Sequence, residues 1–279
     1  MRTVDNAAIA AAAEARFRSE YHYAVFEYLR SAKVIQALER AGAPLRGRVL
    51  DAGCGGGGTA LSLAEEAGFS VGLDLDARFR GSGTVLAAEK RIANAAFIQG
   101  DGGRLPFRSG SFDLVFSHSV IEHVRSAEAY LDECHRVLRR GGFLYLSTAP
   151  YLSLAGAHLP RLLVPFPLHV LLGRRVAFST FRLLARRAPW SLQERTEANT
   201  FLTMAAQGRE KEDDLLQRVT VGRLGAWIRA AGFRLLREER YVTGFFRRFV
   251  PAPLRRLLEA TPGTRDLMIG HIQCVLEKP

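Results

Sequence analysis

The chain has few cysteines and no long apolar run, which are the features that cross-link or anchor many proteins outside the cytoplasm. Of its 279 residues only three are cysteines, Cys54, Cys134 and Cys274, and they form no C-x-x-C pair. This spacing argues against a disulfide framework and a zinc site, and predicts a reduced, cytoplasmic location. The alanine-rich start has no signal-peptide cleavage site, and no apolar run reaches the roughly 18 residues that a spanning helix needs. We therefore expect neither export nor a membrane span.

Lysine is scarce in a strongly basic chain. Four of the 39 basic residues are lysines, so 35 are arginines, and the formal net charge is +11. Such a charge ordinarily suggests nucleic acid or an anionic membrane as a partner. A GC-rich genome also produces an arginine bias, together with abundant alanine, glycine and leucine. Local clusters of arginine therefore say more than the overall charge.

Short apolar runs alternate with helical segments along most of the chain. Each strand-like run is followed by a turn or loop, and the helical segments repeat apolar residues at helical spacing. This alternation predicts a parallel, doubly wound α/β sheet. Ser126 is the expected N-cap of one helix. The expected strands are 48–51, 70–76, 95–101, 112–119, 141–149, 233–242 and 270–278. The expected helices are 59–68, 126–138 and 220–232, together with one or two helices over 7–41.

The stretch VLDAGCGGGG contains two overlapping motifs. Gly53, Gly55 and Gly58 fit the G-x-G-x-x-G spacing with which a dinucleotide fold binds a pyrophosphate. Asp51 begins the alternative pattern D-x-G-x-G-x-G, whose glycines are Gly53, Gly55 and Gly57. A carboxylate beside the turn suits a cationic ligand better than a pyrophosphate, because opposite charges attract. Capping of the following helix is the structural alternative for Asp51.

Five segments match, in order, the motifs of class I S-adenosylmethionine-dependent methyltransferases, which the chain resembles over residues 45–150. The segments are VLDAGCGGGG, VGLDLD, FIQGDGGRLPF, FDLVFSHSVIEHV and RVLRRGGFLYLS. The resemblance implies a Rossmann-like α/β fold, with a seven-stranded, mostly parallel sheet and helices on both faces. It also implies S-adenosylmethionine as the cofactor. We divide the chain into an N-terminal helical cover (1–44), the cofactor-binding core (45–150), an inserted helical substrate lid (151–218) and the C-terminal part of the core sheet (219–279).

The resemblance also implies which residues contact the cofactor. Asp74 takes the ribose hydroxyls, Asp101 and Gly102 take the adenine, and the region of Ser117 and His118 contacts the methionine end. A dinucleotide fold would use an acid like Asp74 as well, and Asp101 before a glycine is also ordinary turn chemistry. The implied cofactor-binding set is Asp51, Gly53, Gly55, Gly57, Asp74, Leu75, Asp101, Gly102, Ser117 and His118.

Methyl transfer depends chiefly on alignment and on the exclusion of water, because a sulfonium is already activated. A base is needed only for a hydroxyl or acidic-carbon acceptor, and histidine titrates in the suitable range. The candidate catalytic residues are His123 first, then His118 and His158. Alternatively, Glu122 and His123 merely start a helix or pack under the lid. Their spacing matches no zinc signature, so no metal is expected.

Acidic residues are missing from Tyr151 to Trp190, which has six arginines among leucine, valine and phenylalanine. Residues 244–256 repeat this character. Arginine beside large apolar residues is typical of an interfacial membrane segment or of a lid over an apolar substrate, and solvated arginines on an ordinary helical lid are the plainer alternative. We predict methylation of an oxygen or carbon of a small, apolar or lipid-linked metabolite, with peripheral contact at the inner membrane face through 159–188.

Three other functions are alternatives to this prediction. An RNA-directed methyltransferase is the first, but base-amino methyltransferases resemble one another in an Asp/Asn-Pro-Pro-Tyr motif after the fourth strand, where this chain has SHSV. A cytosine C5 enzyme would need a cysteine near that loop, and there is none. Nucleic acid is therefore not the expected partner. The other two are an NAD-dependent protein and a protein that binds S-adenosylmethionine without catalysis.

Overall fold

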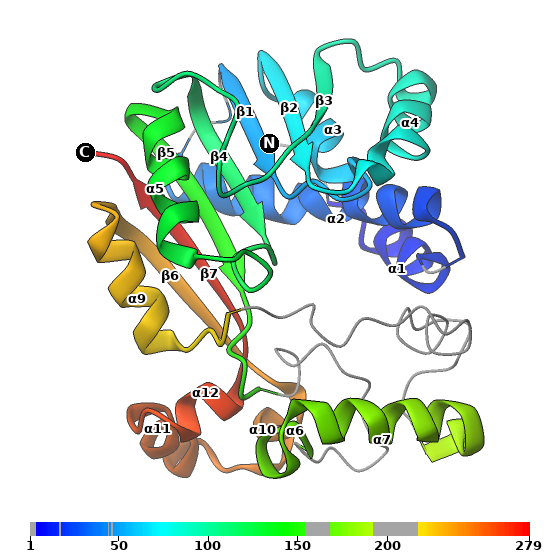
Figure 1. Ribbon diagram of the computed structural model, residues 1–279, viewed down its shortest axis with the longest axis vertical. Coiled ribbons are helices and arrows are strands. Elements are labelled where there is room, and N and C mark those ends of the chain that lie inside the picture. The colour runs from blue at the N-terminus through cyan, green and yellow to red at the C-terminus, as the bar shows by residue number, and fades with distance from the viewer. Residues whose placement is uncertain (1–3, 17, 44, 46, 154–167, 192–216) are drawn as a thin grey trace. The chain divides into compact units, whose positions relative to one another are not determined.

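The protein is described by a computed structural model over residues 4–16, 18–43, 45, 47–153, 168–191 and 217–279 (Figure 1). The chain divides into two compact units. Unit 1 comprises Met1–Leu146, Trp227–Glu238 and Cys274–Pro279, and unit 2 comprises Ser147–Ala226 and Glu239–Gln273. The division into cover, core, lid and C-terminal part stays a prediction.

The strands form one seven-stranded sheet in the order β3-β2-β1-β4-β5-β7-β6. Parallel pairing joins β1 to β2, β2 to β3 and β1 to β4. The predicted α/β fold with a seven-stranded, mostly parallel sheet is confirmed. The chain crosses from β3 back past β1 to β4, so the strand order reverses between β1 and β4, where open α/β sheets bind their ligands. The strands are β1 Arg48–Ala52, β2 Phe69–Asp74, β3 Ala95–Gln99, β4 Phe112–His118, β5 Leu138–Thr148, β6 Arg234–Val242 and β7 Ile269–Glu277.

Side-chain caps fix where three helices of unit 1 begin. The Asp5 carboxylate accepts from the Ala8 N–H at 2.9 Å, and the Ser126 hydroxyl accepts from the Ala129 N–H at 3.1 Å, as predicted for Ser126. Ser19 caps the second helix, so residues 7–41 form two helices. The helices that begin in the first 146 residues are α1 Asn6–Ala15, α2 Glu20–Arg40, α3 Gly58–Ala64, α4 Gly83–Lys90 and α5 Ala127–Val137, with the 3₁₀ turn Ala77–Arg80.

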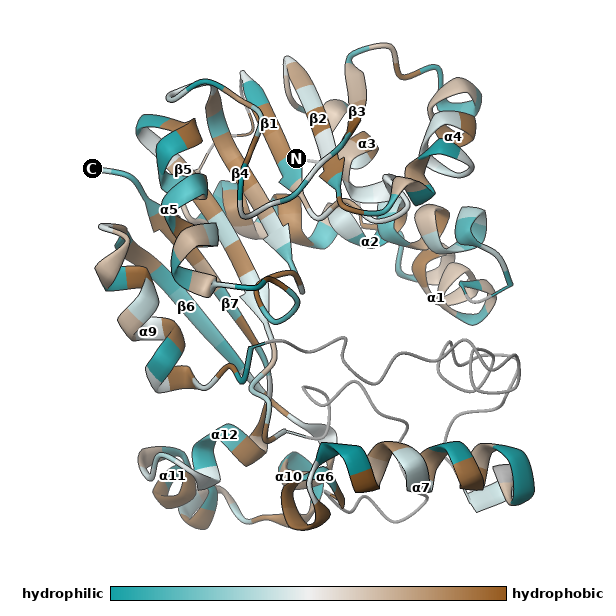
Figure 2. Ribbon diagram, in the orientation of Figure 1, coloured by the Kyte–Doolittle hydropathy of each residue, from teal (hydrophilic) through white to brown (hydrophobic). Residues whose placement is uncertain are grey.

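The core of unit 1 lies on the central strands and on one face of α2. The rings of Phe116 on β4 and Tyr145 on β5 are stacked 4.8 Å apart. Ile35 and Leu38 of α2 belong to the same buried cluster. Figure 2 shows hydrophobic residues along β1 and β4. Burial on both faces explains why these strands read as continuous apolar runs.

One helix ends earlier than the sequence predicts. The pattern predicts a helix to residue 68, but α3 ends at Ala64. The Asn94 amide donates to the carbonyls of Ala64 at 2.7 Å and Ala67 at 3.1 Å. Carbonyls at the end of a helix lack partners within the helix. The Asn94 side chain, just before β3, supplies hydrogen bonds to these carbonyls and so allows α3 to end early.

Unit 2 consists mostly of short helices around small clusters. Ala177 and Phe181 of α7 are buried together, and the buried Asp266 carboxylate accepts from the Val221 N–H at 2.7 Å. Of the predicted lid, 154–167 and 192–216 lie outside the described residues, and His158 is among them. The helices of the later chain are α6 Leu168–Leu172, α7 Arg174–Arg187, α9 Val221–Ala230, α10 Gly244–Phe249, α11 Ala252–Ala260 and α12 Thr264–Met268, with the 3₁₀ turn Pro189–Ser191. Among the described residues, none of the helices is both long and apolar enough to cross a bilayer.

Candidate functional site

Asp51 lies at the carboxyl end of the central strand β1, beside the point where the strand order reverses. Its side chain is buried, with the residue 2% exposed. The Ala60 N–H of α3 donates to the carboxylate. The second oxygen, Oδ2, is buried without a hydrogen-bond partner among the described residues. Asp51 therefore binds the following helix, as the structural alternative predicts, and retains one oxygen for another donor.

The glycine turn after Asp51 is confined on two sides and open on a third. Gly53 has φ +95°, and a Cβ there would lie 2.2 Å from Cγ2 of Val120, in the loop after β4. A Cβ on Gly58 would lie 1.9 Å from the backbone oxygen of Ala24 in α2. A Cβ on Gly55 would meet nothing within 4 Å. A ligand can therefore approach the turn at Gly55.

Asp74 is tied to the glycine turn from the neighbouring strand. It is the last residue of β2, and its Oδ2 accepts from the Gly55 N–H at 2.8 Å. Its Oδ1 accepts from the Asp76 N–H at 2.9 Å. An ionised carboxylate has about four lone-pair sites, so both oxygens can accept further bonds. Leu75 beside it is 71% exposed.

Asp76 is the neighbouring acid with a different environment. It is exposed, and its carboxylate lies 3.5 Å from the Arg78 guanidinium. Exposed pairs of this kind contribute little to stability. Asp76 thus provides a matched comparison for Asp74.

Glu27 is a third carboxylate of this region, and the sequence analysis missed it. It lies on α2 with its side chain 13% exposed, and Oε1 is 3.6 Å from the Arg30 guanidinium. Its Oε2 is buried without a hydrogen-bond partner among the described residues. Its position in the sequence could have indicated this burial. Glu27 follows Ala24 by three residues and precedes Ser31 by four, which places it on the same face of the helix as these two residues.

Two of these three carboxylates, Glu27 and Asp51, have a raised pKa. Burial, opposed by Arg30 and Arg78, raises the pKa of Glu27 to about 7, with a further increase from Asp74 and Glu20. Burial also raises the pKa of Asp51 well above its usual range, and the negative charges of Glu27 and Asp74 raise it further. An effect of one charge on the pKa of another group requires proximity. The region is therefore an acidic one in which a bound cation would stabilise the charged carboxylates.

Asp101 and Gly102 follow β3 by two and three residues. The exposed Asp101 carboxylate accepts from the Gly103 N–H at 2.8 Å, which is the turn chemistry named as the alternative role. A Cβ on Gly102 would lie 2.9 Å from the Tyr130 ring, so a larger residue would disturb the packing on α5.

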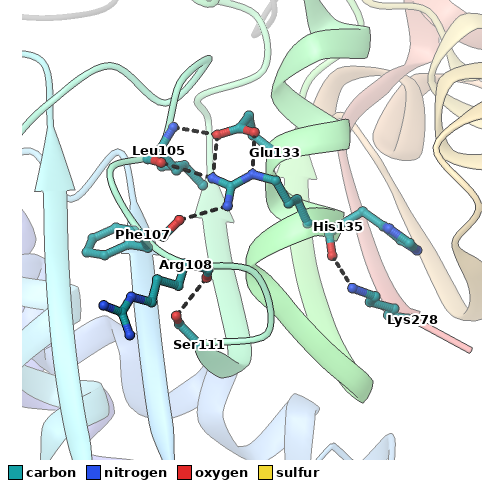
Figure 3. A network of polar contacts seen from close by, with 8 residues as sticks. Leu105, Phe107, Arg108, Ser111, Glu133, His135 and Lys278 are labelled. Carbon is teal, nitrogen blue, oxygen red and sulfur yellow. Dashed lines mark hydrogen bonds and ion pairs between the residues drawn. The ribbon is translucent and has the colours of Figure 1, made fainter.

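A charged network fixes the loop that contains Asp101. The Arg136 guanidinium of α5 donates to the carbonyls of Leu105 at 3.0 Å and Phe107 at 2.7 Å, and it is paired with Glu133 at 2.6 Å. The Glu133 carboxylate in turn accepts from the Leu105 N–H at 2.7 Å (Figure 3). Hydrogen bonds to Arg136 lower the pKa of Glu133. This network anchors the loop to α5.

The loop after β4 contains the candidate catalytic residues. The buried Ser117 hydroxyl accepts from the Tyr130 hydroxyl at 2.8 Å, so its side chain faces α5. His118 ends β4 half-buried, with its ring 6.3 Å from that of Phe116. Glu122 is buried and His123 is half-buried, in a turn closed by the His123 N–H and the Val120 carbonyl at 2.8 Å. The suggestion that Glu122 and His123 start a helix is wrong, because α5 begins only at Ala127.

Two further observations concern metals and histidine. Within the described part of the chain, no group of three or more His, Cys, Asp and Glu residues could hold a metal ion.

His169 of α6 is a buried histidine that the sequence analysis missed. Its Nε2 lies 3.0 Å from the Tyr151 carbonyl, and burial lowers its pKa. A neutral ring that is hydrogen-bonded to the backbone indicates a structural role for His169.

Comparison with known proteins gives a family match over the region just described. Residues 50–146 match the family described as "Methyltransferase domain". The chain is similar to the demethylmenaquinone methyltransferase of Beutenbergia cavernae, with 35% identity over 134 residues, 46% of this chain and 54% of the relative. It is also similar to the malonyl-[acyl-carrier protein] O-methyltransferase of Enterobacter lignolyticus, with 34% identity over 164 residues, 58% of this chain and 59% of the relative.

The chain therefore spans a little more than half the length of these two relatives. Among solved structures, an S-adenosylmethionine-dependent methyltransferase from Mesorhizobium loti aligns with a TM-score of 0.52 at 19% identity, over 88% of this chain and 97% of that one. At this identity the likeness concerns the fold alone.

Proposed function

Residues 50–146 are a class I S-adenosylmethionine-dependent methyltransferase domain, and from that premise we propose that the whole protein methylates an oxygen or carbon of a small, apolar or lipid-linked acceptor. The predictions of the family and of S-adenosylmethionine as the cofactor are confirmed by the family match and by the relatives. The observation that carries the proposal is the buried Asp51 oxygen without a partner, beside a turn that is open at Gly55.

The chemistry of the site agrees with this cofactor. S-Adenosylmethionine supplies an activated methyl group on a sulfonium and carries an ammonium, so acidic surroundings attract it. Asp51 and the backbone at Gly53, Gly55 and Gly57 would hold the methionine end. Asp74 would accept the ribose hydroxyls with its remaining lone pairs. The remaining contacts proposed are Leu75 beside Asp74, Asp101 and Gly102 at the adenine edge, and Ser117 and His118 near the methionine end.

The role of the protein in catalysis would be to align the acceptor and exclude water. His123, and then His118, is the candidate to take a proton from a hydroxyl or an acidic carbon. Both residues are half-buried in or beside the loop after β4, which packs on the glycine turn through Val120. The Ser117 hydroxyl is bonded to Tyr130, so Ser117 would contribute backbone groups.

Calorimetric titration tests the cofactor site. We expect S-adenosylhomocysteine to bind at micromolar strength, NADH not to bind, and Asp74→Ala to lose the binding. Asp76→Ala is the matched control, because it removes an exposed acid two residues away. Binding of NADH instead, or equal loss in both variants, would contradict the proposed site.

The acceptor class is proposed from the relatives and from the later part of the chain. The two relatives are named for demethylmenaquinone and for a malonyl group on acyl-carrier protein. The test is transfer of a labelled methyl group to a quinone precursor, a free fatty acid, malonyl-acyl-carrier protein and tRNA. Transfer to tRNA alone would overturn the proposal in favour of the RNA-directed alternative.

Peripheral membrane contact belongs to the same proposal. Exposed apolar residues alternate with arginines along α7 (Figure 2) and across α10 and α11. Phe249 and Leu257 are each 65% exposed, and 244–258 contains four arginines and no acid. Arginine with exposed aromatic and aliphatic groups suits an anionic lipid surface. Of the predicted contact 159–188, residues 159–167 lie outside the described residues.

Vesicle co-sedimentation tests this contact. We expect the protein to pellet with phosphatidylglycerol vesicles and to stay in solution with phosphatidylcholine vesicles. The double variant F249S/L257S should weaken the binding, because it removes apolar area and leaves the arginines in place. Binding unchanged in this variant would mean that charge alone attracts the protein.

A further inference from the structure

The buried face of α2 lies against the glycine turn. The Ser31 hydroxyl donates to the Thr59 hydroxyl of α3 at 3.1 Å, and the Ala24 backbone leaves no room for a side chain at Gly58. Glu27 lies between these two contacts, within one turn of each. Its carboxylate is therefore directed toward the region of the turn and of Asp51.

Two carboxylate oxygens in this region lack donors. They are Oδ2 of Asp51 and Oε2 of Glu27, both buried without a hydrogen-bond partner among the described residues. The Arg30 guanidinium lies 3.6 Å from the other oxygen of Glu27, and the Arg30 side chain is 28% exposed. Buried acceptors without donors are unfavourable, and a pair of neighbouring anions is more so. A ligand that brings N–H groups and positive charge would satisfy both oxygens.

The missing donors indicate which part of the cofactor belongs here. A sulfonium carries positive charge but no hydrogen-bond donor, whereas an ammonium has three N–H groups. Two carboxylates with one vacant oxygen each match the ammonium. We propose that Glu27 acts together with Asp51 to bind the ammonium group at the methionine end of the cofactor. This inference rests on the proposed function and adds a residue outside the family match, which begins at residue 50.

The test compares two ligands that differ in the amino-acid group. S-Adenosylhomocysteine carries the ammonium, and 5′-methylthioadenosine lacks it. At pH 8, we expect Glu27→Gln to weaken the first ligand by about 10- to 100-fold, the usual range for a charged hydrogen bond, and to leave the second unchanged. Asp51→Asn should show the same selectivity. Glu39→Gln, an exposed acid on the same helix, should change neither affinity.

Each outcome separates this inference from the proposed function. If Glu27→Gln binds S-adenosylhomocysteine like the wild type, or loses both ligands equally, Glu27 does not bind the ammonium. If the wild-type protein binds neither ligand, the proposed function itself fails. Thermal melting of each variant checks folding. Glu27→Asp retains the charge and should recover part of the selectivity that glutamine abolishes.

Discussion

The stability of the unliganded protein should depend on pH through Glu27. Its pKa is raised from 4.5 to about 7 in the folded chain, mainly by burial. Because a pKa difference of one corresponds to about 1.36 kcal/mol, this increase lowers the free energy of unfolding at high pH by about 3 kcal/mol. Between pH 4.5 and 7 the folded state binds more protons than the unfolded state, so the free energy of unfolding falls as pH rises through this window. Above pH 7 the loss is complete.

Glu27→Gln removes this loss because an amide does not ionise. We expect the unliganded variant to be about 3 kcal/mol more stable than wild type at pH 8 and nearly equal to it at pH 4.5. For a chain of this size the difference at pH 8 is a rise in melting temperature of about 6–12 °C. The raised pKa of Glu27 already contains the effects of the charged groups around it, which are Arg30, Arg78, Asp74 and Glu20. Asp51 and Tyr23 also interact electrostatically with Glu27. The substitution also removes the negative charge of Glu27 from the surroundings of Asp51, which adds to the stabilisation at pH 8.

Thermal melting at several pH values, with and without saturating S-adenosylhomocysteine, is the assay. The ligand should shrink the difference between variant and wild type at pH 8, because the wild-type carboxylate then has a cation. Glu39→Gln should melt like the wild type throughout. A variant that is less stable at pH 8, or whose difference from wild type is the same at every pH, would refute the reasoning, since Glu27 would then have a full partner. A stabilising variant that weakens ligand binding is the usual trade-off at a functional site.

Further predictions concern packing and hydrogen bonds. Gly58→Ala should cost about 2–3 kcal/mol in denaturant unfolding and weaken S-adenosylhomocysteine binding, because its Cβ would collide with the α2 backbone; unchanged stability would contradict the close approach. Arg136→Met should cost about 2 kcal/mol at pH 7, measured by urea unfolding. The pKa of Glu133 is lowered in the folded protein, so the stabilisation by its pair with Arg136 is fully present at pH values above the usual pKa of a glutamate. It should be lost as the pH falls through the lowered pKa of Glu133. Trp227→Phe should cost about 1 kcal/mol in thermal melting, since Nε1 donates to Glu128 at 2.7 Å, and no change would mean that water replaces the bond.

Local signals made much of the sheet predictable. The helix capped by Ser126 and the strand that ends at Asp74 begin or end within one or two residues of their expected positions, because caps and apolar runs are encoded nearby. The cofactor was predictable for a different reason, namely the order of five motifs along one region. Asp51 could be singled out because its charge is unusual at a glycine turn.

Long-range contacts made the rest unpredictable. The early end of α3 depends on Asn94, which is 30 residues away from Ala64. Glu27 reads as one acid in a long amphipathic helix, and only the packing of α2 on the turn makes it a buried carboxylate. Helix α4 was not predicted either, since it is only eight residues long and begins at a glycine. Helices α10, α11 and α12 are short segments of five to nine residues that the pattern did not separate.

The position of β7 has a consequence for synthesis on the ribosome. It is the last of the seven strands to be translated, yet it lies between β5 and β6. While β7 is still in the exit tunnel, β5 is an open edge and β6 has no neighbour to pair with. Strands β1 to β5 can assemble during that time, because all of them have already emerged. The nascent chain therefore passes through a state with an exposed β5 edge, and such edges favour aggregation and chaperone binding until β7 inserts.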